Sequence, residues 1–262
     1  MRTSLLAIAL LAGCSPRSSP SQPPGNVATV GAAIQLERDQ PLGWIGLGTL
    51  RATDNSWIPV STQVGALTLT DDPLPPRVTV VPRTGAAQLL SVGNSIPLQY
   101  GCDNNQLGVR PLSGVRIAAG PAWILPPETP PSWRPAPLAL TTPQRTPTHR
   151  SHAASTLVFD LVRRDPSRVA LTITREGAKV FDSVYERAVM DGADLSAALD
   201  LAETVPGIPE PVAGWSFAPA GPFLVVLLVP GYEGVTLQPI LIEETSARLV
   251  EGMELYLYWC AF

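Results

Sequence analysis

The sequence predicts a mainly β protein, built from two packed antiparallel β-sandwich-like modules with one short helix. The 262 residues include 29 prolines and 21 glycines, a composition that favours short strands joined by many turns. With 45% hydrophobic and 15% charged residues, the chain is apolar enough to fill one large or two small cores. The net charge of −4 comes without a Lys/Arg cluster, which argues against nucleic acid as a partner.

The first residues have the features of an export signal. Arg2 supplies a positive start, residues 5–12 form an apolar run too short to cross a bilayer as a helix, and the small Gly13 precedes Cys14. The tetrapeptide Leu11-Ala12-Gly13-Cys14 resembles the lipobox of bacterial lipoproteins. The alternatives are an ordinary secretory signal with a chance cysteine, and a membrane-spanning helix.

The lipobox resemblance implies a location and a membrane contact. It implies that residues 1–13 are a signal peptide removed before Cys14, and that the Cys14 sulfur receives a diacylglycerol. Ser15 stands where some lipoproteins have a retaining aspartate, so the resemblance favours the outer membrane, with the chain facing the periplasm or the exterior. Residues 14–26, rich in Ser and Pro, are expected to form a solvated tether.

The other two cysteines are predicted to pair. With Cys14 set aside as the anchor, an exported chain retains Cys102 and Cys260. A disulfide between them would close a long loop and, in the chain-entropy model, add at most about 5 kcal/mol of stability. Two separate buried thiols are the alternative.

The N-terminal β module is predicted over residues 27–120. Short β-rich segments such as "GWIGLGTLRAT", "RVTVV" and "IPLQYGC" follow one another, each bounded by Pro, Gly or Asn/Asp pairs. This spacing is typical of a sandwich or a partly open barrel. Residues 121–150 have a proline every few positions and are predicted to be a connector or a long surface loop.

The C-terminal β module is predicted over residues 151–262. Strict alternation in "STLVFDLVRRDPSRVALTITREGAKVFDSVYER" indicates a three-stranded antiparallel meander with turns at residues 165–167 and 176–177. The segment "DLSAALDLAET", residues 194–204, has apolar residues at helical spacing and predicts the short helix. Three more strands follow, and "FLVVLLV" is so continuously apolar that both its faces should be buried.

The C-terminal strand has a second interpretation. Tyr256, Tyr258, Cys260 and Phe262 alternate in a way that resembles the terminal signature of outer-membrane barrels. Such barrels need repeated strands of about ten residues, whereas prolines interrupt this chain at shorter intervals. The favoured interpretation is a last strand held in a sheet.

Motifs for catalysis and for cofactors are lacking. The sequence has no Gly-x-Ser-x-Gly elbow, no His-Glu-x-x-His, no phosphate-binding loop with Lys and no Cys-x-x-Cys, so no cofactor is expected. His149 and His152 are weak metal candidates that Asp160 or Asp191 would complete, but exposed loop histidines are favoured. The stretches "CDNN" and "DGAD" could give oxygen ligands to calcium, but neither supplies a full loop, and a turn is the default after Cys102. The acidic pair at residues 71–72 is interpreted as a turn.

Tryptophans are the remaining candidates for contact. Trp123 and Trp133 lie in the Pro-rich segment, where burial is hardest to guarantee, and are the two expected to touch a partner or a glycan. The leading functional hypothesis is a non-enzymatic envelope lipoprotein that binds a protein partner or has a structural role. The alternatives are a cell-wall glycan-binding module and a metal-assisted hydrolase using His149 and His152.

Overall fold

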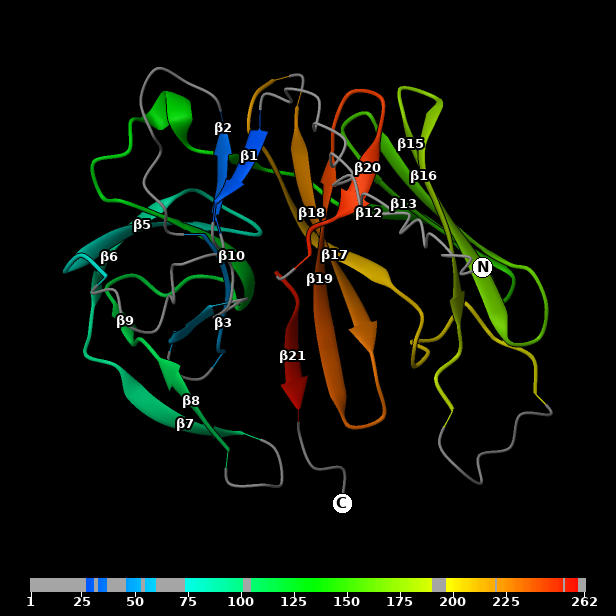
Figure 1. Cartoon of the computed structure of the whole chain (residues 1–262), viewed down its shortest axis with the longest axis horizontal. Helices are drawn as coiled ribbons and strands as arrows, with labels where there is room; N and C mark the ends of the chain where they lie inside the picture. Colours follow the sequence, from blue (N-terminus) through cyan, green and yellow to red (C-terminus); the bar gives the residue numbers. More distant parts are fainter. Residues whose placement is uncertain are drawn as a thin grey trace, which may run out of the picture.

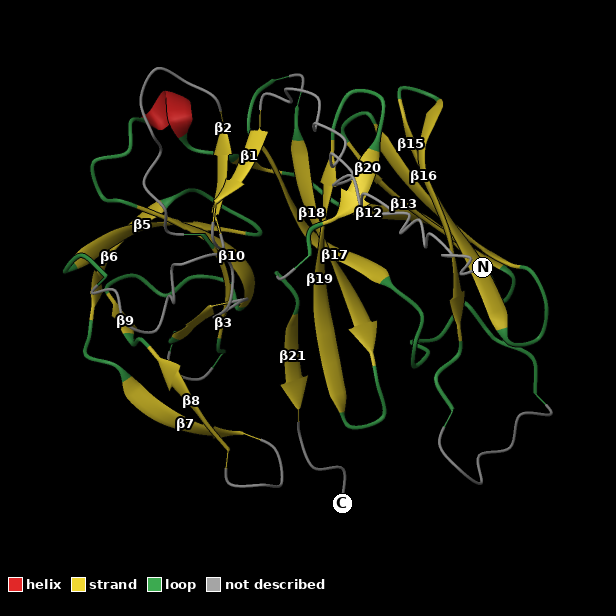
Figure 2. Ribbon diagram, in the orientation of Figure 1, coloured by secondary structure: helices red, strands yellow, loops and turns green. Residues whose placement is uncertain are grey.

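Three large antiparallel sheets make up the body of the protein. The computed structural model describes residues 27–30, 33–36, 46–52, 55–59, 74–100, 105–189, 197–219, 221–251 and 253–258. These residues are almost entirely strand and loop, which confirms the mainly β prediction (Figure 2). None of the described elements is a helix long and apolar enough to cross a membrane.

The N-terminal sheet has the strand order β4-β3-β10-β5-β6-β9. Its strands are β3 (Leu47–Leu50), β4 (Trp57–Pro59), β5 (Arg77–Pro82), β6 (Gln88–Val92), β9 (Leu112–Ser113) and β10 (Gly120–Leu125). Two separate hairpins accompany it, β1 (Val27–Val30) with β2 (Ala33–Leu36) and β7 (Ile96–Tyr100) with β8 (Asn105–Val109).

The central sheet has the order β11-β17-β18-β19-β20, and β21 also pairs with β19. Its strands are β11 (Ala136–Pro137), β17 (Glu210–Ser216), β18 (Phe223–Pro230), β19 (Gly234–Ile242), β20 (Ala247–Leu249) and β21 (Leu255–Tyr258). A 3-10 turn, η1 (Pro131–Trp133), precedes β11 along the chain.

The third sheet, here named the meander sheet, runs β12-β13-β14-β15-β16 in chain order. Its strands are β12 (Thr141–Arg145), β13 (His149–Ala154), β14 (Leu157–Arg163), β15 (Arg168–Arg175) and β16 (Ala178–Glu186). The predicted three-stranded meander is confirmed as β14-β15-β16. At its second turn Glu176 and Gly177 both have positive φ, as type I′ hairpin turns require.

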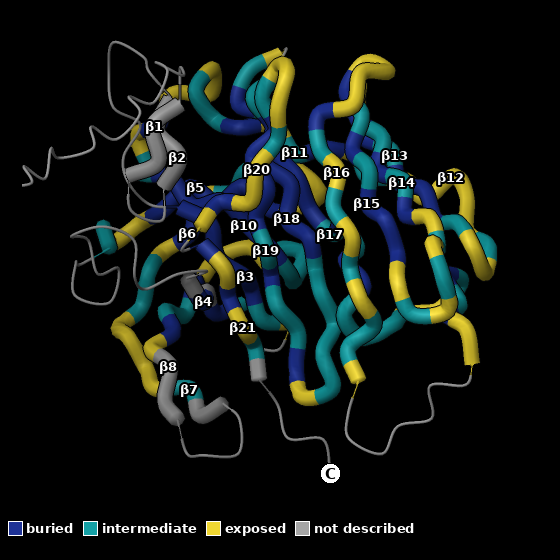
Figure 3. Tube along the Cα trace, turned by 45° about the vertical axis from the view of Figure 1, so that its right-hand side comes forward, coloured by how far each residue is buried: buried dark blue, intermediate teal, exposed yellow. Residues whose placement is uncertain are grey.

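The central sheet lies between the other two sheets (Figures 1 and 3). On one face, Trp215, Leu224 and Val226 join a core cluster with N-terminal-sheet residues such as Trp123. On the other face, Val225 and Leu227 join a cluster with the apolar residues of the meander sheet. The expectation that both faces of "FLVVLLV" are buried is therefore confirmed, because alternate residues of β18 belong to different cores.

The Pro-rich segment, predicted as a connector or a long surface loop over residues 121–150, contains strand at residues 121–125, 136–137, 141–145 and 149–150. Residues 120–125 form β10, an interior strand paired with both β3 and β5. Pro121 is tolerated because the pairing with β5 begins only at Ala122, so only β3 lies beside the proline. Residues 126–135 make the crossing from the N-terminal sheet to the central sheet.

The predicted helix over residues 194–204 is not formed in its described part, 197–204, which contains bends and a turn. Leu199 and Leu201 are both buried, a two-residue periodicity that suits an extended chain and not a helix. Their N–H groups donate to the carbonyls of Pro166 and Pro147 instead of to a preceding helical turn. We name residues 197–203 the strap.

Candidate functional site

Several predicted site residues lie outside the described residues. These are the proposed anchor Cys14, the proposed disulfide partners Cys102 and Cys260, and the acidic candidate Asp191. Lipidation and the disulfide therefore stay predictions.

The two tryptophans expected to contact a partner belong to the core. Trp123 is 2% exposed, and its ring centroid lies 5.1 Å from Phe217 in an edge-on arrangement and 6.3 Å from Trp215. Trp133 is half-buried and packs against the same cluster. The expectation that Trp123 presents its ring at the surface is wrong, because β10 places it between two sheets.

The two histidines point to opposite faces of the meander sheet. They are three residues apart in β13, and side chains of a strand alternate between faces. His152 lies opposite the core residue Phe159 and is 2% exposed, whereas His149 is on the outer face. One metal ion cannot be held by both, and within the described ranges no group of three or more His, Cys, Asp or Glu side chains is placed to hold one.

On the outer face, His149 contacts Asp160 of β14. The His149 Nε2 and Asp160 Oδ1 atoms are 2.9 Å apart, and about a third of each side chain is exposed (28% and 34%). Asp160 lies opposite Ser151, so the histidine reaches it diagonally across the ladder. Both residues are metal-site candidates from the sequence, and the structure brings them into contact.

On the inner face, His152 is buried, with charged groups of both signs nearby. Its Nδ1 is 3.1 Å from the Thr142 hydroxyl of β12, and its buried Nε2 has no hydrogen-bond partner among the described residues. Burial lowers the pKa of His152, and the nearby guanidinium groups of Arg150 and Arg145 lower it further, while Glu210 opposes them. Burial therefore favours the neutral form of the imidazole.

Three arginines hold the strap by its backbone carbonyls. Arg150 Nε donates to the Leu201 carbonyl at 2.7 Å, and its terminal nitrogens donate to the Glu203 carbonyl and, at 3.3 Å, to Glu210. Arg163 donates to the Leu199 carbonyl at 2.8 Å, and Arg187 donates to the Ala197 carbonyl at 3.0 Å. Every second carbonyl of the strap, from residue 197 to 203, thus accepts from a guanidinium.

Arg150 is the most unusual of the three, because it is only 2% exposed. It lies opposite Leu161 of β14, at a core-facing position of the sheet. Buried guanidinium groups persist where their donors are satisfied, and here Arg150 donates three hydrogen bonds, two to backbone carbonyls and one to a carboxylate. The sequence analysis did not predict that arginines bind the strap carbonyls. The local signal for it is the two-residue spacing of Leu199 and Leu201, which indicates an extended strap.

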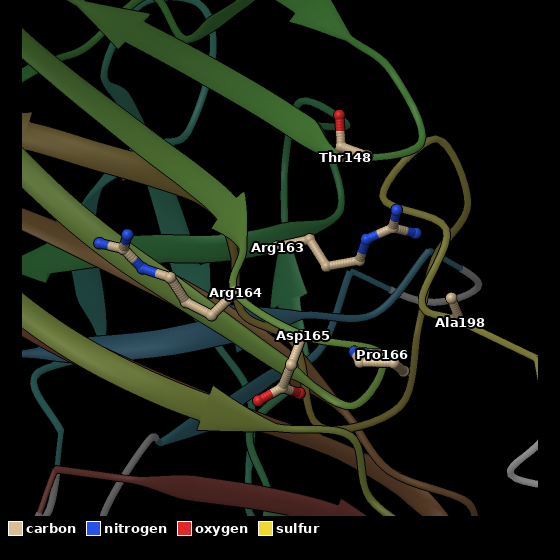
Figure 4. Close-up of a pocket in the computed structure, with 6 residues that line it drawn as sticks. All are labelled: Thr148, Arg163, Arg164, Asp165, Pro166 and Ala198. Carbon is tan, nitrogen blue, oxygen red and sulfur yellow. The ribbon is translucent and has the colours of Figure 1, made fainter.

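A surface hollow of about 340 Å³ opens beside the strap. Its lining includes Thr148, Arg163, Arg164, Asp165 and Ala198 (Figure 4). The Arg163 side chain extends toward Ala198 and the Arg164 side chain extends the opposite way, so the two charges do not converge. The carboxylate of Asp165 is already occupied by Ser167 and Arg168. The hollow therefore lies at the border between the strap and the meander sheet, where Arg163 binds the strap.

The outer face of the meander sheet combines an apolar row with a polar row. In one cross-strand row, Val162 (39% exposed) and Val184 (59% exposed) flank the buried Ala170. The neighbouring row consists of Ser151, Asp160, Thr172 and Asp182. A compact apolar centre beside polar side chains is the arrangement found at the centres and rims of protein interfaces, which makes this face the candidate binding surface.

We predict that His152 makes the folded state acid-sensitive. Because burial lowers its pKa below the ordinary value of 6.5, the unfolded chain takes up the proton first. The free energy of unfolding should therefore fall as the pH drops below about 6.5, by up to about 1.4 kcal/mol per pH unit. His152→Gln should flatten this slope between about pH 7 and 5 in urea titrations, whereas His149→Gln should leave it steep. Equal slopes for the His152→Gln variant and the unaltered chain would contradict the assignment.

We predict that Arg150→Met destabilises the protein by about 3 kcal/mol, because two strap carbonyls and Glu210 lose their donor. The strap should also become susceptible to proteolysis between residues 197 and 203. Arg164→Met is the matched control, since the Arg164 side chain makes no hydrogen bond or ion pair with another described residue and its backbone N–H still donates to the Arg168 carbonyl in the variant; it should change stability by less than about 0.5 kcal/mol. Denaturant unfolding and limited proteolysis measure both effects, and similar behaviour of the two variants would refute the role given to Arg150.

The chain was compared with protein-family models, with curated proteins and with solved structures. None of the three comparisons finds a match.

Proposed function

We propose that this chain is an exported lipoprotein of a bacterial envelope, anchored through Cys14 at the outer membrane. The support is the succession of Arg2, the apolar residues 5–12 and the lipobox-like Leu11-Ala12-Gly13-Cys14. Each buried methylene of an acyl chain contributes about 0.8 kcal/mol, so two or three chains would hold the protein durably. The Ser/Pro-rich residues 15–26 would separate the folded part from the membrane surface.

We further propose that the folded part is a non-enzymatic module that binds an envelope protein. The observation that supports this best is the outer face of the meander sheet, where Val162 and Val184 lie exposed beside a row of hydroxyl and carboxylate groups. Exposed apolar residues grouped in this way are enriched at protein contact sites.

A protein partner is favoured over a glycan by the positions of the tryptophan rings. Sugar-binding platforms on β folds use exposed aromatic faces. Of the tryptophans whose side chains are described, Trp123 and Trp215 are fully buried and Trp133 packs against the same core. The meander sheet instead offers valine, threonine and carboxylate groups to its surroundings.

The anchor is tested by Cys14→Ser in the full-length precursor. The unaltered chain should incorporate a fatty-acid label and lose the mass of residues 1–13. The variant should take up no label and should remain at precursor size, because in the lipoprotein class processing follows lipidation of the cysteine. Intact-mass measurement and in-cell lipid labelling report both outcomes. Cleavage of the Cys14→Ser precursor at an unchanged site, without label in either chain, would indicate an ordinary secretory signal.

The binding face is tested by a photoreactive residue placed at position 162 in the native envelope. Leu89 of β6 in the N-terminal sheet is the matched control, because it is 43% exposed and Val162 is 39% exposed. We expect one dominant protein adduct from position 162 and none from position 89. Equal labelling from both positions would contradict the assignment of the face. Retention of the chain on purified cell-wall polysaccharide without any protein adduct would favour the glycan-binding alternative.

A further inference from the structure

Among the described residues, the strand β16 is the longest strand at the edge of a sheet. It has nine residues and its ladder runs only to β15. The other terminal strands differ: β4, β9, β11 and β20 have two or three residues, and β21 has four. The opposite edge of the meander sheet, β12, contains Pro143 and a register shift, both of which hinder pairing.

The side chains of β16 alternate between two surfaces. Phe181 and Tyr185 are half-buried on the inner side and pack against the core shared with the central sheet. Asp182 and Val184 are exposed on the outer side. A bulge between the pairs Ile173–Phe181 and Thr174–Lys179 limits regular alternation to residues 181–186.

We propose that β16 pairs with β16 of a second copy of this chain, antiparallel, with the two-fold axis at Ser183. In this register Asp182 of each copy lies opposite Val184 of the other, and Phe181 lies opposite Tyr185. Residues directly opposite in an antiparallel ladder share a face, so each pairing matches inner with inner and outer with outer. The two five-stranded sheets become one ten-stranded sheet, and the contact is the same patch on both copies, as a two-fold dimer requires.

Self-complementarity is the reason for choosing a second copy as the occupant. The charged group nearest the axis, Asp182, meets a valine and no like charge. The half-buried rings of Phe181 and Tyr185 meet across the seam and extend the inner core from one copy into the other. The other charged residues of the strand, Lys179 and Glu186, lie beyond the five paired residues. The pairing does not depend on the lipid anchor. It shares Asp182 and Val184 with the partner face proposed above, but it forms along the strand edge and leaves Val162 free.

A contact of five residues per copy is small, so a weak and concentration-dependent dimer is expected. The test is sedimentation equilibrium of the full chain, purified from membranes in a density-matched detergent, over a series of protein concentrations. Val184→Asp puts two carboxylates opposite each other at two places and should weaken dimerisation about tenfold or more. Val184→Lys puts an ammonium group opposite Asp182 and should leave the dimer equal or tighter.

Two further variants test the register itself. The double variant Asp182→Lys with Val184→Asp again brings opposite charges together and should restore dimerisation to within a few-fold of the unaltered chain. Val162→Asp, on the same sheet face but on the interior strand β14, should leave the dimer unchanged. Both positions tolerate a charged side chain because they are partly exposed, Val184 at 59% and Val162 at 39%. Circular dichroism melting checks that every variant is folded.

The outcomes separate this inference from the proposed function. A chain that stays monomeric at every concentration, equal weakening by Val184→Asp and Val184→Lys, or no rescue in the double variant would overturn the β16 pairing. Loss of the photo-adduct at position 162 concerns the partner face alone, because the dimer should tolerate changes there.

Discussion

The whole structure depends on a sheet that must be apolar on both faces. Since a sheet packs on each side of it, β18 can place almost no polar side chain on either surface, and its run from Phe223 to Leu227 is buried without interruption. Trp215 and Leu224 pack in the core shared with the N-terminal sheet. Val225 and Leu227 pack in the core shared with the meander sheet. Because neighbouring residues of one strand belong to separate cores, a change of strand register by one residue would exchange the two sets of side chains.

The sequence predicts best where the signal is local and repeated. The alternation of Leu157, Phe159 and Leu161 is sufficient to indicate β14 and its neighbours, and the unbroken apolar run indicates the doubly covered β18. The sequence predicts less well where a residue that usually disrupts a strand, such as proline, stands at a position that tolerates it. The number of prolines suggests a loop at residues 121–125. Pro121 nevertheless fits in β10, because the pairing of β10 with β5 begins only at the next residue.

The strap and the histidines show a different limit. Leu199 fits a helical pattern with Leu195 and an extended pattern with Leu201, and the choice between them is made by three arginines that are distant in sequence. Contacts between residues far apart in sequence also decide that His152 is buried while His149 is partly exposed. Strand alternation places the two histidines on opposite faces, but only the packing of the meander sheet against the central sheet tells which face is inside.

The position of the central sheet along the chain has a consequence for the order in which the molecule is completed. Apart from the two-residue β11, all its strands come from residues 210–258, the last part of the described chain. The N-terminal sheet and the meander sheet are both made earlier, and each has an apolar face that, among the described residues, packs on the central sheet. During synthesis both surfaces therefore stay open to water, and to other chains, until residues 210–258 have been made. This one segment covers both apolar faces, so the two cores are completed together.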